Sequence, residues 1–448
     1  MFRRPRPVAA DGSGGAVPRQ VGRGDRRGAR GAAPARRRLP RRGVRAGARV
    51  RRGFRPRAAG GRRDAAGRCR AGPDGRCGRL SAEPVRPDGP DLQGRRAVGA
   101  PVVSAPPTVP SSPHDCVWEV TLACDARCIH CGSAAGRARE RELDTAEALD
   151  ACDQLAALGT REVTLSGGEP LLRDDWPALT RRLADRGVRV AMISNGLGWD
   201  ARAVRAALAA GLRSVTLSLD GPADLHDELR GVEGGFARAI GAIRMLREAG
   251  LPVGVSTQVT RPLLPRLAEL ESALAAAGVQ GWQLQMTMPH GRCAEHLDLV
   301  PSPAELPGLV AFVLAARARR AVPVYLADNV GWMTRDEPRL RSAADPPDRF
   351  FAGCQAGLRV LGLTSDGTVR GCLSLPPEFD EGSLRRRRLA ALWADPSAFA
   401  YNRRFRVEEL TGACRACPFA RVCRGGCRSL AWAVGRTVHE CRYCLRLP

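Results

Sequence analysis

The sequence predicts an α/β protein: a partial (β/α)6 TIM-like barrel followed by a cysteine-rich C-terminal domain. Between about residue 114 and residue 286, six apolar stretches of strand length alternate with amphipathic helical stretches. Such alternation is typical of a parallel sheet covered by helices. Six units are too few to close an eight-stranded barrel. Beyond residue 350 the alternation stops, and eight of the sixteen cysteines follow.

The expected strands are short, apolar and end in small or polar residues. They cover Trp118–Leu122, Glu162–Leu165, Arg189–Ile193, Ser214–Leu219, Val253–Val259 and Gly281–Met286. The expected helices have apolar residues at a spacing of about 3.6. They cover Asp144–Leu158, Asp175–Arg186, Asp200–Ala210, Phe236–Ala249, Pro265–Ala277 and Pro303–Arg320. Asp144 or Thr145, followed by Glu147, predicts an N-terminal cap, and a glycine after most of these helices predicts their ends.

The first part of the chain has a different composition. Arg, Gly, Ala and Pro dominate residues 1–112, and such a segment cannot bury a core. We expect a disordered extension or a gene start placed too far upstream. Residues 1–100 hold 28 of the 71 basic residues and 7 of the 46 acidic ones, so most of the net charge of +25 lies here. Basic residues without interleaved aromatics argue against a nucleic-acid-binding protein.

The cysteines and the apolar segments also bear on location. We find no run of about 18 apolar residues that would span a membrane. The N-terminus lacks the apolar segment of a secretory signal. The later cysteines are spaced as metal ligands rather than as a disulfide framework, which is typical of a reducing compartment. We therefore expect a cytoplasmic protein without a membrane span.

Three cysteines lie on one short loop directly after the first expected strand. Cys124, Cys128 and Cys131 form a C-x3-C-x2-C pattern. Thiolates favour soft metals and iron–sulfur clusters, and cluster ligation normally takes four of them. Three thiolates would therefore leave one iron of a [4Fe-4S] cluster open to another ligand. A structural zinc site is the alternative, but His130 lies inside the loop and is poorly placed to complete it.

This pattern resembles the cluster motif of the radical S-adenosylmethionine (SAM) superfamily. The resemblance implies that the open iron binds SAM, whose reductive cleavage yields a 5′-deoxyadenosyl radical. Polar motifs at the ends of the next strands resemble the family's SAM-binding positions, and ligands of such sheets bind at those ends. By this resemblance the SAM-binding residues are Gly167, Gly168, Glu169, Ser194, Asn195, Ser218, Asp220 and Arg230.

The second cysteine group follows a C-x2-C-x5-C-x3-C pattern that begins at Cys414. This pattern resembles the SPASM domain, a module that binds two auxiliary [4Fe-4S] clusters. The resemblance assigns one cluster to Cys414, Cys417, Cys423 and either Cys441 or Cys444. It assigns the other cluster to Cys354, Cys372 and Cys427. That second set is one cysteine short, and we expect an open or non-cysteine fourth site there.

The resemblance also implies a domain plan and a function. We expect a radical SAM core at 113–330, a linker at 331–350 and a SPASM domain at 351–448. The implied enzyme oxidises a ribosomally synthesised peptide, installing a thioether or carbon–carbon crosslink, with flavodoxin or ferredoxin as reductant. Peptide epimerisation and maturation of a peptide-derived cofactor are alternatives. Sulfatase maturation ranks lower, because Leu373 stands where those relatives place an aspartate base. A non-catalytic electron-transfer protein would not need the Gly-Gly-Glu motif.

Overall fold

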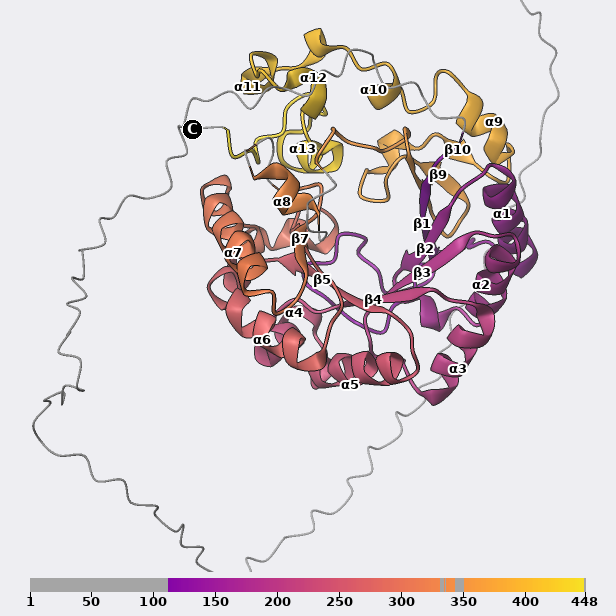
Figure 1. Ribbon diagram of the computed structural model, residues 1–448. Helices are drawn as coiled ribbons and strands as arrows, with labels where there is room; N and C mark the ends of the chain where they lie inside the picture. Colours follow the sequence, from indigo (N-terminus) through magenta and orange to yellow (C-terminus); the bar gives the residue numbers. More distant parts are fainter. Residues whose placement is uncertain (1–111, 331–333, 335, 343–349, 447–448) are drawn as a thin grey trace, which may run out of the picture. The chain divides into compact units, whose positions relative to one another are not determined.

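The fold is that of a computed structural model, which describes residues 112–330, 334, 336–342 and 350–446 (Figure 1). These residues belong to one compact unit, Asp91–Pro448. All but the last residue of the expected extension at 1–112 lie outside the described part of the chain. So does much of the expected linker at 331–350, although a short helix, α8 (Glu337–Arg341), lies within it.

Seven parallel strands form an open barrel. Each strand pairs with the next along the chain, in the order β1-β2-β3-β4-β5-β6-β7. They are β1 (Asp115–Thr121), β2 (Glu162–Gly167), β3 (Arg189–Ser194), β4 (Ser214–Ser218), β5 (Val253–Val259), β6 (Trp282–Met286) and β7 (Val324–Leu326). The expected partial barrel is thus confirmed for six strands, and β7 extends it.

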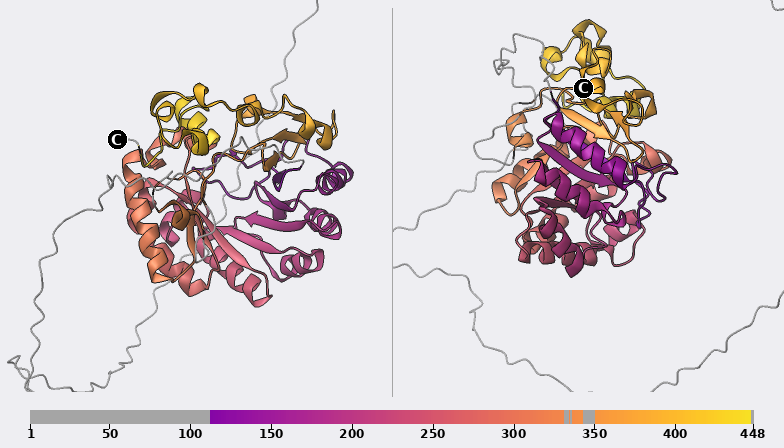
Figure 2. Two further views of the ribbon diagram at one scale, coloured as in Figure 1. Left: turned by 45° about the horizontal axis from the view of Figure 1, so that its top comes forward. Right: turned by 90° about the vertical axis from the view of Figure 1, so that its right-hand side faces the viewer.

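Helices cover the outer side of the curved sheet (Figures 1 and 2). They are α1 (Thr145–Ala157), α2 (Trp176–Asp185), α3 (Ala201–Ala210), α4 (Ala223–Arg230), α5 (Gly235–Glu248), α6 (Leu267–Ala277) and α7 (Leu306–Arg319). The expected cap is confirmed: Asp144 and Glu147 form a reciprocal capping box at the start of α1. Helix α4 was not among the expected helices, because its eight residues are mostly polar.

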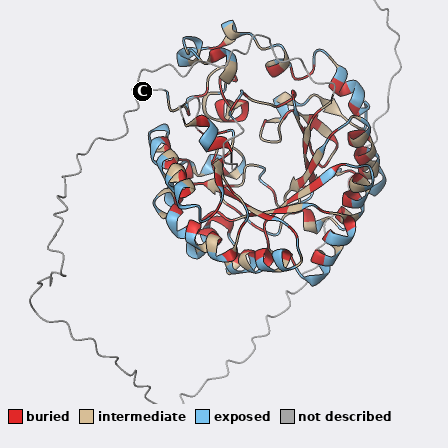
Figure 3. Ribbon diagram, viewed as in Figure 1, coloured by how far each residue is buried: buried red, intermediate tan, exposed pale blue. Residues whose placement is uncertain are grey.

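The core lies between the sheet and the helices. Figure 3 shows buried residues concentrated on the strands and on the inner helix faces. Trp118 on β1 and Trp282 on β6 are fully buried, and both faces of a parallel sheet must be covered in this way. Residues Leu297–Arg319 are long and apolar enough to cross a membrane by length and composition alone. Leu309 and Val313 of α7 are buried in the core here.

The C-terminal region continues the same sheet at its other edge. β8 (Val360–Leu363) pairs in parallel with β1, and β9 (Thr368–Arg370) and β10 (Gly382–Ser383) follow as antiparallel strands. The rest of the region consists of short helices. They are α9 (Leu389–Ala394), α10 (Ala400–Arg403), α11 (Gly412–Arg415), α12 (Ala420–Cys423) and α13 (Arg428–Gly435). Cys354 precedes β8 and Cys372 follows β9, so the pairing of β8 with β1 places these two cysteines on the sheet that leads into the first cysteine loop.

Candidate functional site

The first three cysteines lie on the loop between β1 and α1. Cys128 is buried, and Cys124 and Cys131 are half-buried. The loop is tied to the end of α4, because the backbone N–H groups of Arg127 and Ile129 donate to the carbonyls of Arg230 (3.1 Å) and Leu229 (2.9 Å). Burial raises the pKa of Cys124 to about 11. The thiol is therefore protonated at neutral pH, and it must lose this proton when it binds metal, because the metal ligand is the thiolate.

The two glycines of the Gly-Gly-Glu motif lie against the chain that leads into this loop. A Cβ on Gly167 would overlap the Thr121 carbonyl oxygen, and one on Gly168 would overlap the carbonyl oxygen of Ala123. Gly168 N–H donates to the Thr121 carbonyl at 2.8 Å. The glycines are therefore needed for the close approach of two backbone segments. Their possible contact with SAM remains a prediction.

Glu169 links the ends of β2 and β3. Its fully buried carboxylate accepts hydrogen bonds from Ser194 Oγ at 2.9 Å and from the Asn195 N–H at 2.7 Å. Burial raises the pKa of Glu169 to about 7. Asn195 in turn donates through Nδ2 to Asp125, at 2.6 Å, on the cysteine loop. Three of the expected SAM-binding residues therefore form one hydrogen-bonded group that reaches the loop.

Asp220 is the centre of a second buried group. Its Oδ2 lies 2.8 Å from His130 Nε2 and accepts from Arg230 Nε at 2.9 Å, while its Oδ1 accepts from the Gln258 N–H at 2.8 Å. Burial opposes ionisation of Asp220, but the charges of Arg230 and His130 outweigh it and hold its pKa below the usual range. Asp220 and Arg230, both expected SAM ligands, are thus paired with each other.

The link from Asp220 to His130 was not expected from the sequence. His130 lies between Cys128 and Cys131, so Asp220 fixes the cysteine loop from the end of β4. Ser218, the last residue of β4, is half-buried at the same end of the sheet. Seven of the eight expected SAM-binding residues therefore lie at the ends of β2, β3 and β4, and Arg230, the last residue of α4, reaches them through Asp220.

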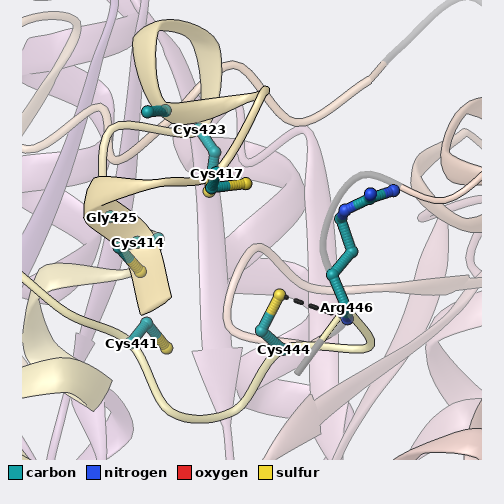
Figure 4. Close-up of a pocket in the computed structure, with 9 residues that line it drawn as sticks. Cys414, Cys417, Cys423, Gly425, Cys441, Cys444 and Arg446 are labelled. Atoms are coloured by element: carbon teal, nitrogen blue, oxygen red, sulfur yellow. Dashed lines mark hydrogen bonds between the residues drawn. The ribbon is translucent and has the colours of Figure 1, made fainter. Parts of the chain in front are cut away.

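The eight C-terminal cysteines form two neighbouring groups. Five of them line one cavity, and Figure 4 shows Cys441 and Cys444 entering it from the C-terminal loop. The five are Cys414, Cys417, Cys423, Cys441 and Cys444. Cys354, Cys372 and Cys427 form the second group: burial raises the pKa of Cys427, and the nearby charges of Cys354 and Cys372 raise it further. Among the described residues, no three His, Cys, Asp or Glu side chains converge as ligands of a single ion would. A [4Fe-4S] cluster instead spreads its thiolates around a larger space.

Two buried arginines beside these cysteines fit an anionic cluster. Arg424 and Arg428 are 5% and 0% exposed, and both stack on the Phe405 ring. Arg428 donates to neutral oxygens of Asn402 and Val438. Within the described residues, Arg424 Nε and Arg428 Nη2 have no hydrogen-bond partner. A buried cation needs a counter-charge, and the thiolates of a bound iron–sulfur cluster would supply one.

A polar cavity of about 340 Å³ lies between the barrel loops and the C-terminal region. Gly132 and Ser133, directly after Cys131, form one wall together with His290. Leu373 and Ser374, directly after Cys372, form another wall. The cavity therefore joins the surroundings of the first cysteine loop to those of the second cysteine group. Sequence reasoning missed it, because its lining comes from five separate segments.

Comparisons with known proteins agree with this geometry. Residues 118–272 match the radical SAM superfamily, and residues 354–418 match the SPASM iron–sulfur cluster-binding domain. The AdoMet-dependent heme synthase of Methanosarcina barkeri is 28% identical over 75% of this chain and 98% of its own length. The PqqA peptide cyclase of Ruegeria pomeroyi is 30% identical over 73% of this chain and 85% of its own length.

A solved structure shares the fold. SuiB of Streptococcus suis, bound to its precursor peptide SuiA, has a TM-score of 0.60 at 18% identity, covering 75% of this chain and 76% of SuiB. At that identity the likeness shows the fold alone. The sequence matches go further, because one matched range contains the first cysteine loop and the other contains Cys354, Cys372, Cys414 and Cys417. This chain therefore belongs to the radical SAM superfamily, with a SPASM domain, and its cofactors are SAM and [4Fe-4S] clusters.

Proposed function

We propose that this enzyme oxidises a ribosomally synthesised peptide and installs a thioether or carbon–carbon crosslink. The cavity between the first cysteine loop and the C-terminal region carries this proposal. Its volume of about 340 Å³ is at the small end of the range for ligand sites. It would therefore take a short peptide segment or a few side chains rather than a folded protein.

When bound, SAM and the first cluster supply a 5′-deoxyadenosyl radical that removes a hydrogen atom from the substrate. The protein's own residues position that substrate and exclude water. The cavity wall contains Glu119, which is buried and paired with Arg139 Nε at 2.8 Å. Ser365 also donates to Glu119, at 3.0 Å. The pairing of Glu119 with Arg139 leaves this part of the wall close to neutral, which suits a substrate chain of mixed polarity.

Two names among the similar proteins support a peptide substrate. PqqA peptide cyclase is named for a peptide, and SuiB was solved with a precursor peptide. Epimerisation and maturation of a peptide-derived cofactor would use the same cavity. Sulfatase maturation stays disfavoured, because Leu373 lines the cavity where a carboxylate base would stand.

A heme precursor is the second candidate substrate. The Methanosarcina barkeri relative is named a heme synthase, and Arg139, Arg370 and Arg436 line the cavity. Arginines bind carboxylates well, and heme precursors carry several. However, Arg139 already pairs with Glu119, and Arg370 already pairs with Asp380. Among the described residues, only Arg436 of the three has no carboxylate partner, and one arginine is fewer than a precursor with several carboxylates would need. We therefore favour the peptide.

The remaining parts of the proposal are a reductant and a location. Flavodoxin or ferredoxin would deliver the electron for SAM cleavage, and the enzyme would work in the cytoplasm. Fourteen free cysteines in the described residues support a reducing compartment, and reductive cleavage of SAM needs an electron donor of this kind.

The test is an anaerobic assay with the full chain, reconstituted with iron and sulfide, plus SAM and a reductant. The candidate peptide is the product of a short open reading frame beside the gene. We expect 5′-deoxyadenosine and a peptide lighter by two hydrogen atoms, and neither product from Cys128→Ala. An unchanged peptide mass together with consumption of an iron porphyrin would overturn the proposal. A peptide that keeps its mass in ordinary water, but gains deuterium when the assay is run in deuterated water, would indicate epimerisation.

A further inference from the structure

The segment after β6 lies between the first cysteine loop and the polar cavity. It is a short 3-10 helix, Gly291–Glu295, that follows His290. His290, Gly291 and Ala294 line the cavity of about 340 Å³. Cys293, in the same short helix, is fully buried. One side of the segment therefore forms a wall of the cavity, and the other side packs into the protein.

The segment also lies directly against the backbone of the cysteine loop. Gly291 has a φ of +58°, and a Cβ there would overlap the carbonyl oxygens of Cys131 and Gly132. The His290 ring occupies the space that a Cβ on Gly132 would need. Glycine at these two positions therefore allows the closest approach of the two segments.

Arg292 holds the cysteine loop at three points. Its backbone N–H donates to the Cys131 carbonyl at 3.0 Å. Its Nε donates to the Cys128 carbonyl at 2.8 Å, and its Nη1 donates to the Ala135 carbonyl at 2.6 Å. The three contacts fix the part of the loop that carries two of the three cysteines. None of them was expected from the sequence, because Arg292 and Cys128 are 164 residues apart.

The positive charge of Arg292 is not used by these contacts. The side chain is half-buried, its acceptors are neutral carbonyls, and within the described residues it has no carboxylate partner. Arg230, which also contacts this loop, is instead paired with Asp220 at 2.7 Å. A partly buried cation needs a counter-charge, and thiolates around a bound cluster would supply it. The same cation would favour the addition of an electron to that cluster.

We propose that Arg292 is a positioning residue for the first cluster, which fixes the cysteine loop against the cavity wall and favours the reduced cluster by its charge. Arg292 acts through the backbone of the loop and does not supply the electron, which comes from the reductant of SAM cleavage. The proposal rests on the first cluster alone. It can therefore fail or succeed whatever the substrate of the enzyme is.

The test is Arg292→Met in the full reconstituted chain, without any peptide. Methionine keeps an unbranched apolar stem but removes the charge and the side-chain donors. We expect unchanged iron content and a more negative reduction potential for the cluster whose EPR spectrum changes with SAM, measured by titration with titanium citrate. The rate of 5′-deoxyadenosine formation at saturating SAM should fall about 10- to 100-fold. Arg292→Lys, which keeps the charge, should keep most of the potential.

Arg261→Met is the matched control. Arg261 also donates to two backbone carbonyls, those of Asp298 at 3.2 Å and Val300 at 2.8 Å, but these acceptors lie outside the cysteine loop. This variant should leave the potential and the rate unchanged. An unchanged potential in Arg292→Met, or equal slowing by both methionine variants, overturns the proposal. If Arg292→Met does not assemble the first cluster, Arg292→Lys decides: an assembled cluster of nearly normal potential supports the proposal, and loss of the cluster from both variants overturns it.

Discussion

The first cysteine loop and the C-terminal cysteines are held in place by different means. The loop is fixed by protein contacts: Asp220 reaches His130 at 2.8 Å, and Asn195 reaches Asp125 at 2.6 Å. Its neighbours are the ends of regular strands. Most of the C-terminal cysteines lie among helices of four to eight residues, beside two buried arginines that each have a nitrogen without a hydrogen-bond partner among the described residues.

This difference indicates two uses of metal. The barrel places its three cysteines before any cluster binds, so that the cluster can keep an iron free for SAM. The C-terminal region has little regular structure of its own, and burial of Arg424 and Arg428 is costly without anionic clusters. We infer that clusters complete the fold there, whereas they only occupy a prepared site in the barrel.

The largest expected effect comes from removing a ligand of the first loop. Cys128→Ala should lower the rate of SAM cleavage by at least about 100-fold, because a prepared site needs its thiolates to hold the cluster. The auxiliary clusters should remain, so iron content should fall by about one third. Measurement of 5′-deoxyadenosine together with iron analysis checks both statements. Loss of all iron would contradict independent assembly of the two regions.

Removal of iron should change the stability of the C-terminal region much more than that of the barrel. In protein prepared without iron, we expect amide hydrogens in residues 410–446 to exchange rapidly, because cluster binding supplies folding free energy there. Strands β1 to β6 should stay protected in the same sample, since their core is hydrophobic. Hydrogen exchange read by mass spectrometry measures both. Equal protection of the C-terminal region with and without iron would refute the proposed role of its clusters.

Much of this fold could be predicted from the sequence, for a physical reason. Each barrel strand is a short apolar run, and each motif stands directly after one, so local patterns were enough to place them at the strand ends. Glu169 and Asn195 are 26 residues apart, yet the parallel register of β2 and β3 makes them neighbours.

The remainder depends on contacts that no local pattern contains. Asp220 and His130 are 90 residues apart, and their pairing depends on how the loop folds over the end of β4. The spacing after Cys427 favours Cys444 over Cys441 as the last ligand, but both cysteines line the same cavity. The substrate cavity was missed for the same reason, because barrel loops and the C-terminal region each supply part of it.

Asp220→Asn tests whether protein contacts alone hold the first loop. The change leaves the buried charge of Arg230 without its partner, and breaking such a pair costs about 3–5 kcal/mol. We expect a lower unfolding temperature and weaker SAM binding, with unchanged auxiliary clusters. Asp224→Asn is the control, because Asp224 also pairs with an arginine, Arg266, but is exposed. Equal effects of the two variants would show that burial of the Asp220 pair is unimportant.

The smallest expected effect concerns the contact between the two regions. Arg385, after β10, donates to both carboxylate oxygens of Glu147 on α1 at 2.7 Å and also to the Glu142 carbonyl. The pair is largely exposed, so Arg385→Met should lower stability by less than about 1 kcal/mol, and less still at high salt. Glu147→Gln should lower the free energy of unfolding by a similar amount. The double variant should lower it by less than the sum of the two single effects.

The pH dependence of this contact has a definite sign. The hydrogen bond from Arg385 lowers the pKa of Glu147 to about 2, below its value in an unfolded chain. The contribution of the pair is therefore present at neutral pH and is lost only as the pH falls toward 2. The difference in unfolding temperature between the unmodified chain and Arg385→Met should be the same at pH 6 and at pH 8. A difference that changes over this range would mean that another titrating group, rather than Glu147, holds the two regions together.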